Sequence, residues 1–450
     1  MIADSNHNPR RIMFNQKPST AQDYIDCYYS RSLRIETDFP KLQETVQPPV
    51  CIVGGGMAGV ATAQSLAERG IHAVLLEANR IAWGASGRNG GFVSAGYSLS
   101  PEKIAKAVGN QHARALYDLT ADAFHLVQKR MGAKKELICE GEEGILGVSW
   151  YDDEKSVRDH VTFMNDVMGE KFEFWPRAKV AEYYNTNKYY DAYFKTRAMQ
   201  LHALNYVCHA ANTAQDAGAR IFEKSPVTAY CKKGDQWHIY TENGHIIADQ
   251  LVLCCGIQTG GIQKKLARSV LSVSTFVLLT EPMEEKLHQT IRAPYGVMDS
   301  RFSSNYYRPL TKDHRLLWGG LVSMFHPSQE KLKKIMMQNL LSIYPQFEGV
   351  QAEVAWGGDM GYPTHKMPQI GRLQEGLWYA QGFGGHGMTS TVAAGEVIAA
   401  AIAEQDERYK LFEPFGLTYA GKPFGPAIAQ TAYWLFQLRD SLQSLRYNRS

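Results

Sequence analysis

The sequence predicts an α/β fold that combines a doubly wound parallel sheet with a second domain built on an antiparallel sheet. Three observations predict it. Residues 50–77 show a strand, a glycine turn, a helix and a second strand in succession. Short apolar runs typical of buried strands return at residues 251–256 and 377–380. Residues 270–281 and 306–321 instead alternate in the manner of antiparallel strands.

The stretch VCIVGGGMAGVATAQSLAERGIHAVLLE, residues 50–77, organises the rest of the chain. Its turn satisfies G-x-G-x-x-G through Gly54, Gly56 and Gly59. The first glycine allows a tight turn, the second leaves room for a pyrophosphate, and the third lets helix and strand approach closely. The N–H groups at the helix start, with the positive end of its dipole, then bind phosphates.

Glu77 ends the second strand of this unit, where an acid accepts hydrogen bonds from a ribose. Because strand, turn, helix, strand and acid come in order, we expect a dinucleotide site rather than a structural unit without a ligand. The carboxylate favours an adenosine with a free 2′-hydroxyl, so FAD or NAD rather than NADP.

The composition is that of an ordinary globular protein and excludes several partners. A chain of 450 residues is long enough for two domains, and 44% hydrophobic with 21% charged residues is usual for such folds. The net charge of +3 is too small to indicate nucleic acid or an acidic membrane. No segment has about 18 uninterrupted apolar residues, so we expect no membrane span.

Cysteine usage and the first residues predict a cytoplasmic protein. The seven cysteines are odd in number and lack CxxC spacing, which indicates thiols of a reducing compartment. The first 20 residues contain no apolar core of a signal peptide. No histidine or cysteine cluster has metal-ligand spacing, so we expect no metal site.

Residues 1–46 are polar and aromatic, and we expect them to form an extension laid over the first domain. Pro48 and Pro49 mark the boundary before the first strand. Residues 84–91, GASGRNGG, hold four glycines in eight positions. This density predicts a second glycine turn whose backbone approaches a ligand closely.

Residues 100–200 predict helices and one hairpin, which we assign to the second domain. Ser100 and Pro101 are the expected N-cap and first turn of a helix, and a longer amphipathic helix follows through Arg130. Residues 137–150 predict a hairpin around Glu142-Glu143-Gly144. Residues 151–185 are mostly helical in pattern.

Residues 204–256 return to the pattern of the first domain. A helix over 204–217 is followed by a strand over 219–222, and residues 237–249 predict a hairpin that turns at Asn243-Gly244. The apolar run at 251–256 is another buried strand. The first domain is therefore discontinuous in sequence.

The last third of the chain contains another glycine turn. A helix is expected over residues 327–344, and the strand at 377–380 leads into QGFGGHGMT, residues 381–389, and a small-residue helix over 390–404. In residues 431–447, Trp434, Leu435, Leu438 and Leu442 have helical spacing. We expect a helix docked on the core rather than one lying on a membrane surface.

These segments together resemble the FAD-dependent D-amino-acid-oxidase (DAO) family, from about residue 26 to about residue 430. The resemblance rests on residues 50–91 and 204–218, on LVLCCG, and on YAQGFGGHGMTSTVAAGEVIA. GASGRNGG, the Tyr-Tyr-Arg at 306–308 and the Trp-Gly-Gly at 356–358 are similar to the gamma-glutamylputrescine oxidoreductase branch.

The resemblance implies an FAD-binding, Rossmann-like domain of glutathione-reductase type and an α+β arrangement in which an antiparallel sheet covers the flavin. Together with the sequence pattern, the resemblance implies that residues 1–46 form an N-terminal extension. The FAD domain then takes residues 47–100, 201–262 and 357–450, and the substrate domain takes residues 101–200 and 263–356.

The resemblance also implies the cofactor residues. The first glycine turn holds the pyrophosphate, Glu77 the adenosine ribose, and the Val227 backbone the adenine. The turn at 84–91 lines the flavin, and the backbone at 385–389 faces its pyrimidine ring, where a helix start stabilises negative charge. The full expected set is Gly54, Gly56, Met57, Ala58, Gly59, Glu77, Ala78, Ser86, Arg88, Asn89, Gly90, Gly91, Val227, Gly256, Gly385, His386, Gly387, Met388 and Thr389.

In this family a C–H beside an amine nitrogen loses a hydride to the flavin, and the protein need only bind the amine and aim its carbon. Tyr306, Tyr307 and Arg308 are the expected substrate-side residues. Because successive side chains of a strand point to opposite faces, these residues could instead be ordinary core and surface residues without a role in substrate binding. His386 is a candidate for proton transfer, or a histidine held by a backbone partner.

One departure from the family bears on the substrate. Members that oxidise free amino acids place a carboxylate-binding arginine soon after the Trp-x-Gly segment, where this chain has Asp359 and Met360. This favours an amine or polyamine derivative, unless Arg308 replaces the clamp. Asp359 either attracts a cationic amine or is a solvated carboxylate.

No cysteine follows Cys255 and residues 84–91 contain no histidine, so we expect non-covalent FAD.

We therefore expect an FAD-dependent amine oxidoreductase acting on a gamma-glutamylputrescine-like substrate, with oxygen or another electron acceptor. The alternative is a D-, imino- or N-methyl-amino-acid oxidase or dehydrogenase. A tRNA-modifying oxidoreductase would need a basic face, which the composition does not indicate. A non-catalytic flavin protein is a further class, and an NAD-only dehydrogenase is disfavoured because the C-terminal glycine turn suits an isoalloxazine. The oligomeric state is left open.

Overall fold

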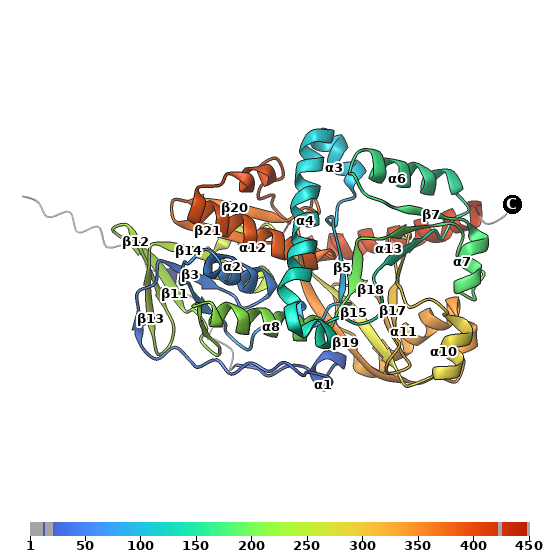
Figure 1. Cartoon of the computed structure of the whole chain (residues 1–450), viewed down its shortest axis with the longest axis horizontal. Helices are drawn as coiled ribbons and strands as arrows, with labels where there is room; N and C mark the ends of the chain where they lie inside the picture. Colours follow the sequence, from blue (N-terminus) through green and yellow to red (C-terminus); the bar gives the residue numbers. More distant parts are fainter. Residues whose placement is uncertain (1–11, 14–20, 422–424, 448–450) are drawn as a thin grey trace, which may run out of the picture.

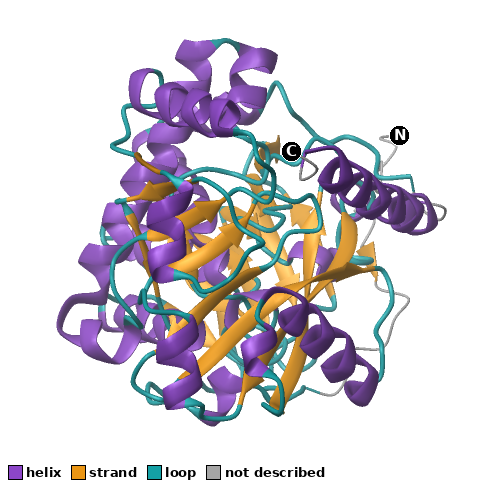
Figure 2. Ribbon diagram, turned by 90° about the vertical axis from the view of Figure 1, so that its right-hand side faces the viewer, coloured by secondary structure: helices purple, strands orange, loops and turns teal. Residues whose placement is uncertain are grey.

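The computed structural model describes residues 12–13, 21–421 and 425–447. Figure 1 shows an elongated molecule with sheets at both ends and the long helix α4 (Asn110–Met131) standing between them. Viewed from one end, strands cross the middle of the molecule and helices lie around them (Figure 2). The architecture is the predicted mixture of α and β layers.

A six-stranded sheet forms the core of one end, with the order β10-β4-β3-β14-β21-β20. Adjacent strands of this sheet run parallel, except that β20 runs antiparallel to β21. The strands are Arg220–Phe222 (β10), Val74–Leu76 (β4), Val50–Val53 (β3), Gln250–Leu253 (β14), Leu377–Gln381 (β21) and Gln369–Gln374 (β20). Segments some 300 residues apart thus meet in one sheet, as predicted.

The first unit of this sheet shows why its glycines are needed. Gly54 has φ 109°, and a Cβ there would lie 2.6 Å from the carbonyl oxygen of Cys254. A Cβ on Gly59 would lie 1.9 Å from the carbonyl oxygen of Gly54. Helix α2 (Met57–Ala67) is therefore pressed against the turn after β3, and all of its residues are buried.

The two faces of the six-stranded sheet are covered differently. Helices α2, α8 (Ala203–Asp216) and α12 (Gly387–Glu404) pack together on one side. On the other side, Trp237 and Ile246 of a five-stranded sheet share a core with alternate residues of β3 and β4. That sheet has the order β1-β11-β12-β13-β2, with strands Ile12–Met13 (β1), Ala229–Lys233 (β11), Gln236–Tyr240 (β12), His245–Ala248 (β13) and Thr45–Val46 (β2). The predicted hairpin over 237–249 is confirmed as β12 and β13.

An eight-stranded sheet forms the other end, with the order β19-β15-β18-β17-β16-β6-β8-β7. Adjacent strands of this sheet run antiparallel, except that β16 and β6 run parallel. The strands are Ala352–Tyr362 (β19), Leu271–Thr280 (β15), Arg315–Ser323 (β18), Tyr306–Leu310 (β17), Gly296–Asp299 (β16), Ile145–Val148 (β6), Ala192–Lys195 (β8) and Glu173–Trp175 (β7). A small separate sheet pairs Phe92–Ser94 (β5) with Ala198–Gln200 (β9).

Of two predictions of local structure, one is confirmed and one needs correction. The alternation over residues 306–321 belongs to two antiparallel strands, β17 and β18, which pair with each other. The predicted hairpin over 137–150 is wrong: residues Lys135–Ile138 form helix α5, and β6 pairs with β16 and β8 instead. The apolar run at 145–148 is a strand as predicted, but its partners come from distant segments that local pattern cannot reveal.

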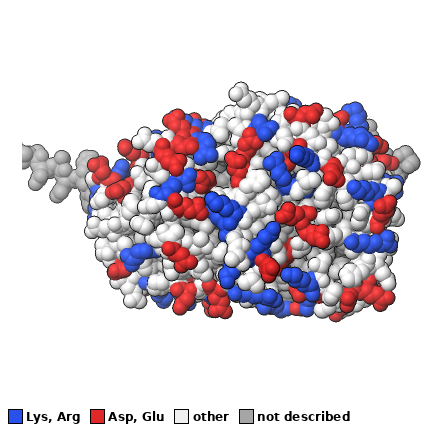
Figure 3. Space-filling model, viewed as in Figure 1, with Lys and Arg blue, Asp and Glu red and all other residues white. Residues whose placement is uncertain are grey.

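The other helices lie mainly around these sheets. They are Tyr28–Arg31 (α1), Pro101–Val108 (α3), Glu154–Asp166 (α6), Arg177–Tyr183 (α7), Lys264–Ala267 (α9), Glu284–Thr290 (α10) and Gln329–Ile343 (α11). Within the described residues, no helix combines the length and apolar character needed to cross a membrane. On the face in Figure 3, positive and negative side chains are mixed and no large basic area stands out.

The C-terminal helix α13 (Gly425–Tyr447) lies against the eight-stranded sheet's end of the molecule. The Tyr433 hydroxyl accepts a hydrogen bond from the Val322 N–H at 3.2 Å, and Asp440 accepts one from the Tyr151 hydroxyl at 3.2 Å. The helix therefore docks as predicted, but the side that faces the rest of the molecule is not the predicted one. The apolar stripe of Trp434, Leu435, Leu438 and Leu442 is exposed.

Candidate active site

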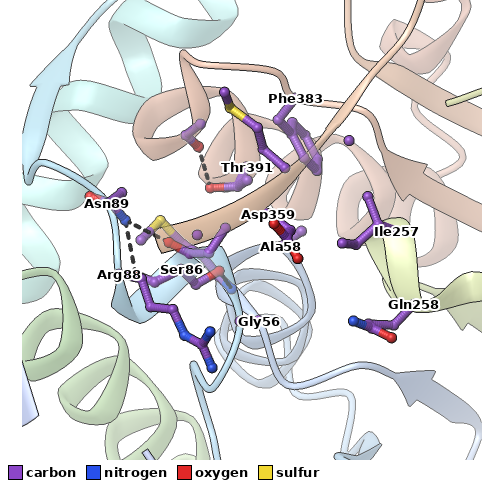
Figure 4. A pocket seen from close by; sticks show the side chains of 18 of the residues that line it. Gly56, Ala58, Ser86, Arg88, Asn89, Ile257, Gln258, Asp359, Phe383 and Thr391 are labelled. Atoms are coloured by element: carbon purple, nitrogen blue, oxygen red, sulfur yellow. Dashed lines mark hydrogen bonds between the residues drawn. The ribbon is translucent and has the colours of Figure 1, made fainter. Parts of the chain in front are cut away.

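A cavity of about 1390 Å³ lies between the two large sheets and is bordered by all three glycine turns. Residues of the turns at 54–58, 84–90 and 382–388 line it, together with side chains from β15 to β19. Figure 4 shows residues from these distant segments facing one space. A volume above the usual 300–1,000 Å³ of a ligand pocket leaves room for a dinucleotide and a substrate together.

Glu77 lies at the end of the cavity formed by the six-stranded sheet. Its carboxylate accepts hydrogen bonds from the backbone N–H groups of Gly55 at 2.6 Å and Asn79 at 2.8 Å. Burial raises the pKa of this carboxyl, and the N–H donors oppose the shift. Ala78, Val227 and Gly256 line the same cavity. Gly59 does not line it, because its role is the close packing of α2.

The turn at 84–91 is fixed largely by its own polar groups. The amide of Asn89 donates to the carbonyls of Ala85 and Ser86 and accepts from the N–H of Gly91. Ser86 Oγ accepts from the N–H of Met57 at 2.9 Å, which ties this turn to the start of α2. Gly91 has φ 77° and does not line the cavity.

Arg88 carries a buried polar atom that no described residue pairs with. Its guanidinium lies over the Trp83 ring, 4.3 Å from the centroid, and its Nη2 has no hydrogen-bond partner within the described part of the chain. Burial lowers the pKa of Arg88. An unpaired buried donor beside two phosphate-type glycine turns fits an anionic ligand in this cavity.

The third glycine turn ends at His386, which precedes the first residue of α12. The imidazole Nε2 lies 3.0 Å from the carbonyl oxygen of Ser94, so this nitrogen carries the proton and donates. Burial lowers the pKa of His386 to about 4, which keeps the ring neutral. Gly385, Gly387 and Met388 also line the cavity.

Thr389 was predicted to face the flavin, but it does not line the cavity. Its hydroxyl donates to the carbonyl of Ser94 at 2.8 Å, and the residue is buried away from the cavity. Thr391, two residues further along α12 and so on nearly the opposite side of the helix, lines the cavity instead.

On β17, Tyr306 faces the cavity. Its ring packs against Gly90 and Gly319, where an added Cβ would lie 2.5 Å and 2.0 Å from the ring carbons. The ring of Phe92 meets it edge-on at 5.6 Å. Burial raises the pKa of the Tyr306 phenol to about 12, so it is a neutral group. Two glycines thus make space for one aromatic side chain over the turn at 84–91.

The two residues that follow on β17 do not line the cavity, which corrects their expected substrate-side role. Tyr307 points to the opposite face, stacks on Trp318 at 4.8 Å and shares a hydrogen bond with the hydroxyl of Tyr344. Arg308 is fully buried beneath the glycine turn. Alternation along the strand accounts for Tyr307, and the buried partners of Arg308 could not be inferred from sequence spacing.

Arg308 is held by an acid and by the turn itself. Its Nη2 lies 2.6 Å from Glu140 Oε2, and its Nε donates to the carbonyl of Gly90 at 2.9 Å. Burial alone would lower the pKa of Arg308, but Glu140 raises it. With its charge neutralised in this way, Arg308 is not free to clamp a substrate carboxylate.

Several lining residues were not foreseen from the sequence. Cys254, Cys255 and Gln258 follow β14, while Thr275, Met298, Gly320, Val322 and Tyr362 come from the eight-stranded sheet. The carboxyl end of a buried strand is a signal that could have found Cys254 and Cys255. The strands of the second sheet offer no such signal, because either face of an antiparallel strand can meet a ligand.

The family model described as DAO, FAD dependent oxidoreductase, matches residues 49–401. The chain belongs to this family. Gamma-glutamylputrescine oxidoreductase of Escherichia coli is 30% identical over 393 residues, covering 87% of this chain and 92% of that protein. The probable oxidoreductase OrdL of Haemophilus influenzae is 29% identical, covering 87% of this chain and 91% of that protein. Glycine oxidase from Geobacillus kaustophilus has a similar fold, with a TM-score of 0.68 and 20% identity over 83% of this chain and 98% of that one.

The protein is therefore an FAD-dependent oxidoreductase, and its residues fit that cofactor. Gly54 and Gly56 line the cavity without side chains, so their backbone is open to a pyrophosphate. The N-terminus of α12 opens on the same cavity. The unpaired Arg88 Nη2 adds a donor for the anionic cofactor.

Proposed function

We propose that this enzyme oxidises the C–N bond of an amine of the gamma-glutamylputrescine type. FAD supplies the hydride acceptor in such a reaction. The substrate carbon loses a hydride and its nitrogen loses a proton, and water then converts the imine to an aldehyde and an amine or ammonia. With oxygen as the final acceptor, two electrons and two protons give hydrogen peroxide. The proposal is supported by the similarity to the Escherichia coli gamma-glutamylputrescine oxidoreductase.

The protein's part in this reaction is to bind, orient and exclude water. We propose that Gly54 and Gly56 hold the pyrophosphate, Glu77 the ribose and Val227 the adenine. The backbone N–H groups at 385–388 would meet negative charge at the flavin pyrimidine ring. Tyr306 supplies a wall that orients the amine.

His386 is placed for a positioning role rather than for proton transfer. Its one protonated nitrogen is engaged by the carbonyl of Ser94, and its pKa of about 4 leaves it without charge. A neutral ring here adds no positive charge that would repel a cationic group of the substrate. This supports the interpretation of a histidine held by a backbone partner.

The observation that carries the choice of an amine is the charge of the cavity wall. Among the described residues that line it, the charged side chains are Glu77, Arg88 and Asp359. Arg308 is paired with Glu140, so the eight-stranded sheet offers no cation for a substrate carboxylate. The unpaired Nη2 of Arg88 favours the second candidate, a D-, imino- or N-methyl-amino-acid oxidase, if that group faces substrate rather than cofactor.

The proposal includes a cytoplasmic location, which is supported by seven unpaired cysteines. It also includes non-covalent FAD and a role in the breakdown of polyamine derivatives.

Anaerobic mixing with a panel of amines and amino acids tests the proposal. Bleaching of the flavin's visible band by gamma-glutamylputrescine or by simple diamines, but not by glycine, D-alanine, proline or sarcosine, is the expected result. Reduction only by the amino acids glycine, D-alanine, proline or sarcosine would favour the second candidate. A flavin that none of these compounds reduces would overturn both.

A further inference from the structure

The eight-stranded sheet contributes a single charged side chain to the cavity. Its lining residues come from β15 to β19 and the loop before β17, and among the described ones all are uncharged except Asp359. The other two charged lining residues, Glu77 and Arg88, follow β4. Arg88 lies against β19, where its backbone carbonyl accepts a hydrogen bond from the Trp356 indole at 2.8 Å, and its charge interacts with Asp359, while its guanidinium lies over the Trp83 ring. Figure 4 shows Asp359 among the side chains that surround the cavity. A carboxylate that is the one charged group of this wall, among the described residues, favours a cationic ligand.

The Asp359 carboxylate is fixed through one of its two oxygens. Oδ1 accepts a hydrogen bond from Ser274 Oγ at 2.5 Å and one from His326 Nε2 at 3.0 Å. Ser274 is buried and lies directly across from Asp359 in the β15–β19 pair. His326 follows β18 and is largely exposed. No donor to Oδ2 is found within the part of the chain that the structure describes, so this oxygen is available to a ligand.

The surrounding walls suit a cation. Tyr306, Tyr362 and Phe383 line the cavity, and aromatic faces attract ammonium groups within about 6 Å of their centroids. Two lysines lie close to this region but do not line the cavity: Lys195, whose charge acts on His386, and Lys366, which lies over the Phe302 ring. Burial lowers the pKa of both, to about 8 for Lys195.

The chemistry decides which substrate nitrogen suits Asp359. An amine that loses a hydride from its neighbouring carbon must have a free lone pair, so the reacting nitrogen has to be neutral. A carboxylate beside an ammonium group favours the protonated form and would oppose this. A second nitrogen, which takes no part in the reaction, has no such conflict.

We propose that Asp359, held by Ser274 and His326, is the subsite for a second, non-reacting ammonium group of the substrate. The enzyme then selects diamine- and polyamine-type substrates over monoamines. This rests on the proposed function, since it assumes that amines reduce the flavin, and it names the feature by which the site recognises them.

The test compares putrescine with n-pentylamine, which has the same number of heavy atoms but lacks the second charge. Anaerobic rapid mixing with the FAD-loaded enzyme gives the ratio of reduction efficiencies for the two amines. Asp359→Asn is expected to lower the putrescine preference about tenfold or more, through weaker binding of putrescine. Asp359→Glu should restore part of it. Asp313→Asn removes an exposed carboxylate from the turn between β17 and β18 and is the matched control.

The possible failures can be told apart. If no amine reduces the flavin of the wild type, the proposed function fails. If amines reduce it but Asp359→Asn keeps the same ratio with native FAD content, the subsite is overturned and the function stands. Equal loss with both amines would also overturn the subsite, because Asp359 would then act at the reacting end. If Asp359→Asn does not retain FAD, Ser274→Ala replaces it: a preference lowered about threefold supports the subsite, and an unchanged one rejects it.

Discussion

The two ends of the cavity are built on different principles. At the end bordered by the six-stranded sheet, the ligand-facing surface is mostly backbone: glycine turns, the start of a helix, and one acid held by backbone N–H groups. At the other end it is formed by side chains from five strands of the eight-stranded sheet. A backbone surface demands particular residues at fixed spacings, whereas a side-chain surface can be built in many ways. The first surface therefore leaves a recognisable pattern in the sequence, and the second is where we expect a substrate preference to be set.

A buried ion pair joins these two ends, and breaking it should have the largest effect on stability. Arg308 of β17 is 1% exposed in its side chain and pairs with Glu140 while holding the carbonyl of Gly90. Glu140→Gln leaves a buried charge without its counter-ion, which costs about 3–5 kcal/mol in comparable cases. We expect a lower free energy of unfolding, measured by urea denaturation, and faster loss of FAD. Asp159→Asn, in the exposed pair with Lys155, is the control and should change neither.

The same pair predicts a pH dependence. Burial would raise the pKa of Glu140, but Arg308 outweighs it and holds the pKa below its usual range. A carboxylate with a lowered folded-state pKa contributes stability above its unfolded pKa, about 4.3, and loses it as the pH falls further. The wild type should therefore lose more stability than Glu140→Gln between pH 5 and pH 3. Parallel curves for the two proteins would show that the pair contributes nothing.

A smaller but still large effect is expected at the backbone end. Gly59→Ala places a methyl group 1.9 Å from the Gly54 carbonyl oxygen, so α2 must move from the turn. Overpacking of this kind costs about 1–3 kcal/mol, and here it also displaces the N–H groups aimed at the phosphates. We expect a lower melting temperature of the apo-protein and little retained flavin. Gly84→Ala, where nothing lies within 4 Å of the added methyl, should keep the melting temperature of the apo-protein.

The contrast between the ends also explains what the sequence could predict. Gly54, Gly59 and Glu77 were predicted because turn geometry, helix packing and ribose binding each require that residue type at that spacing. The β12–β13 hairpin followed from Asn243-Gly244 for the same reason. In each case the local backbone geometry requires a particular residue type at a fixed spacing, and this spacing can be recognised in the sequence.

What escaped prediction depends on contacts between distant segments. Arg308 was expected at the substrate because its strand was expected to lie over the flavin. Its partner, Glu140, lies in a stretch whose local pattern indicated a hairpin, so the pair could not be foreseen. The face of β17 that meets the cavity is set by Gly90 and Gly319, which make room for the Tyr306 ring. Asp359 could be weighed as a cation site, but Ser274 and His326, which orient it, are distant in sequence.

Removing Glu77 should separate the two ends experimentally. Glu77→Ala deletes an acceptor for the ribose and for the N–H groups of Gly55 and Asn79, and a lost buried hydrogen bond costs about 1–3 kcal/mol. We expect FAD to bind about tenfold to a hundredfold more weakly in titrations of the apo-protein. With saturating FAD, the preference between amines should be unchanged. An unaltered FAD affinity would disprove the ribose assignment.

The smallest effect is expected at His386, which lies where the two ends meet. Its pKa of about 4, lowered by burial, means that the unfolded chain takes up a proton between about pH 6.5 and pH 4 while the folded one does not. The wild type should thus lose stability as the pH falls through this window, and His386→Asn should flatten that slope. Above pH 7 the ring is neutral in both states, and Asn can still donate to the Ser94 carbonyl, so amine reduction rates should change only a few-fold. A loss of two orders of magnitude, with a new inflection in the pH profile, would instead make His386 a proton-transfer residue and reverse its assignment as a positioning group.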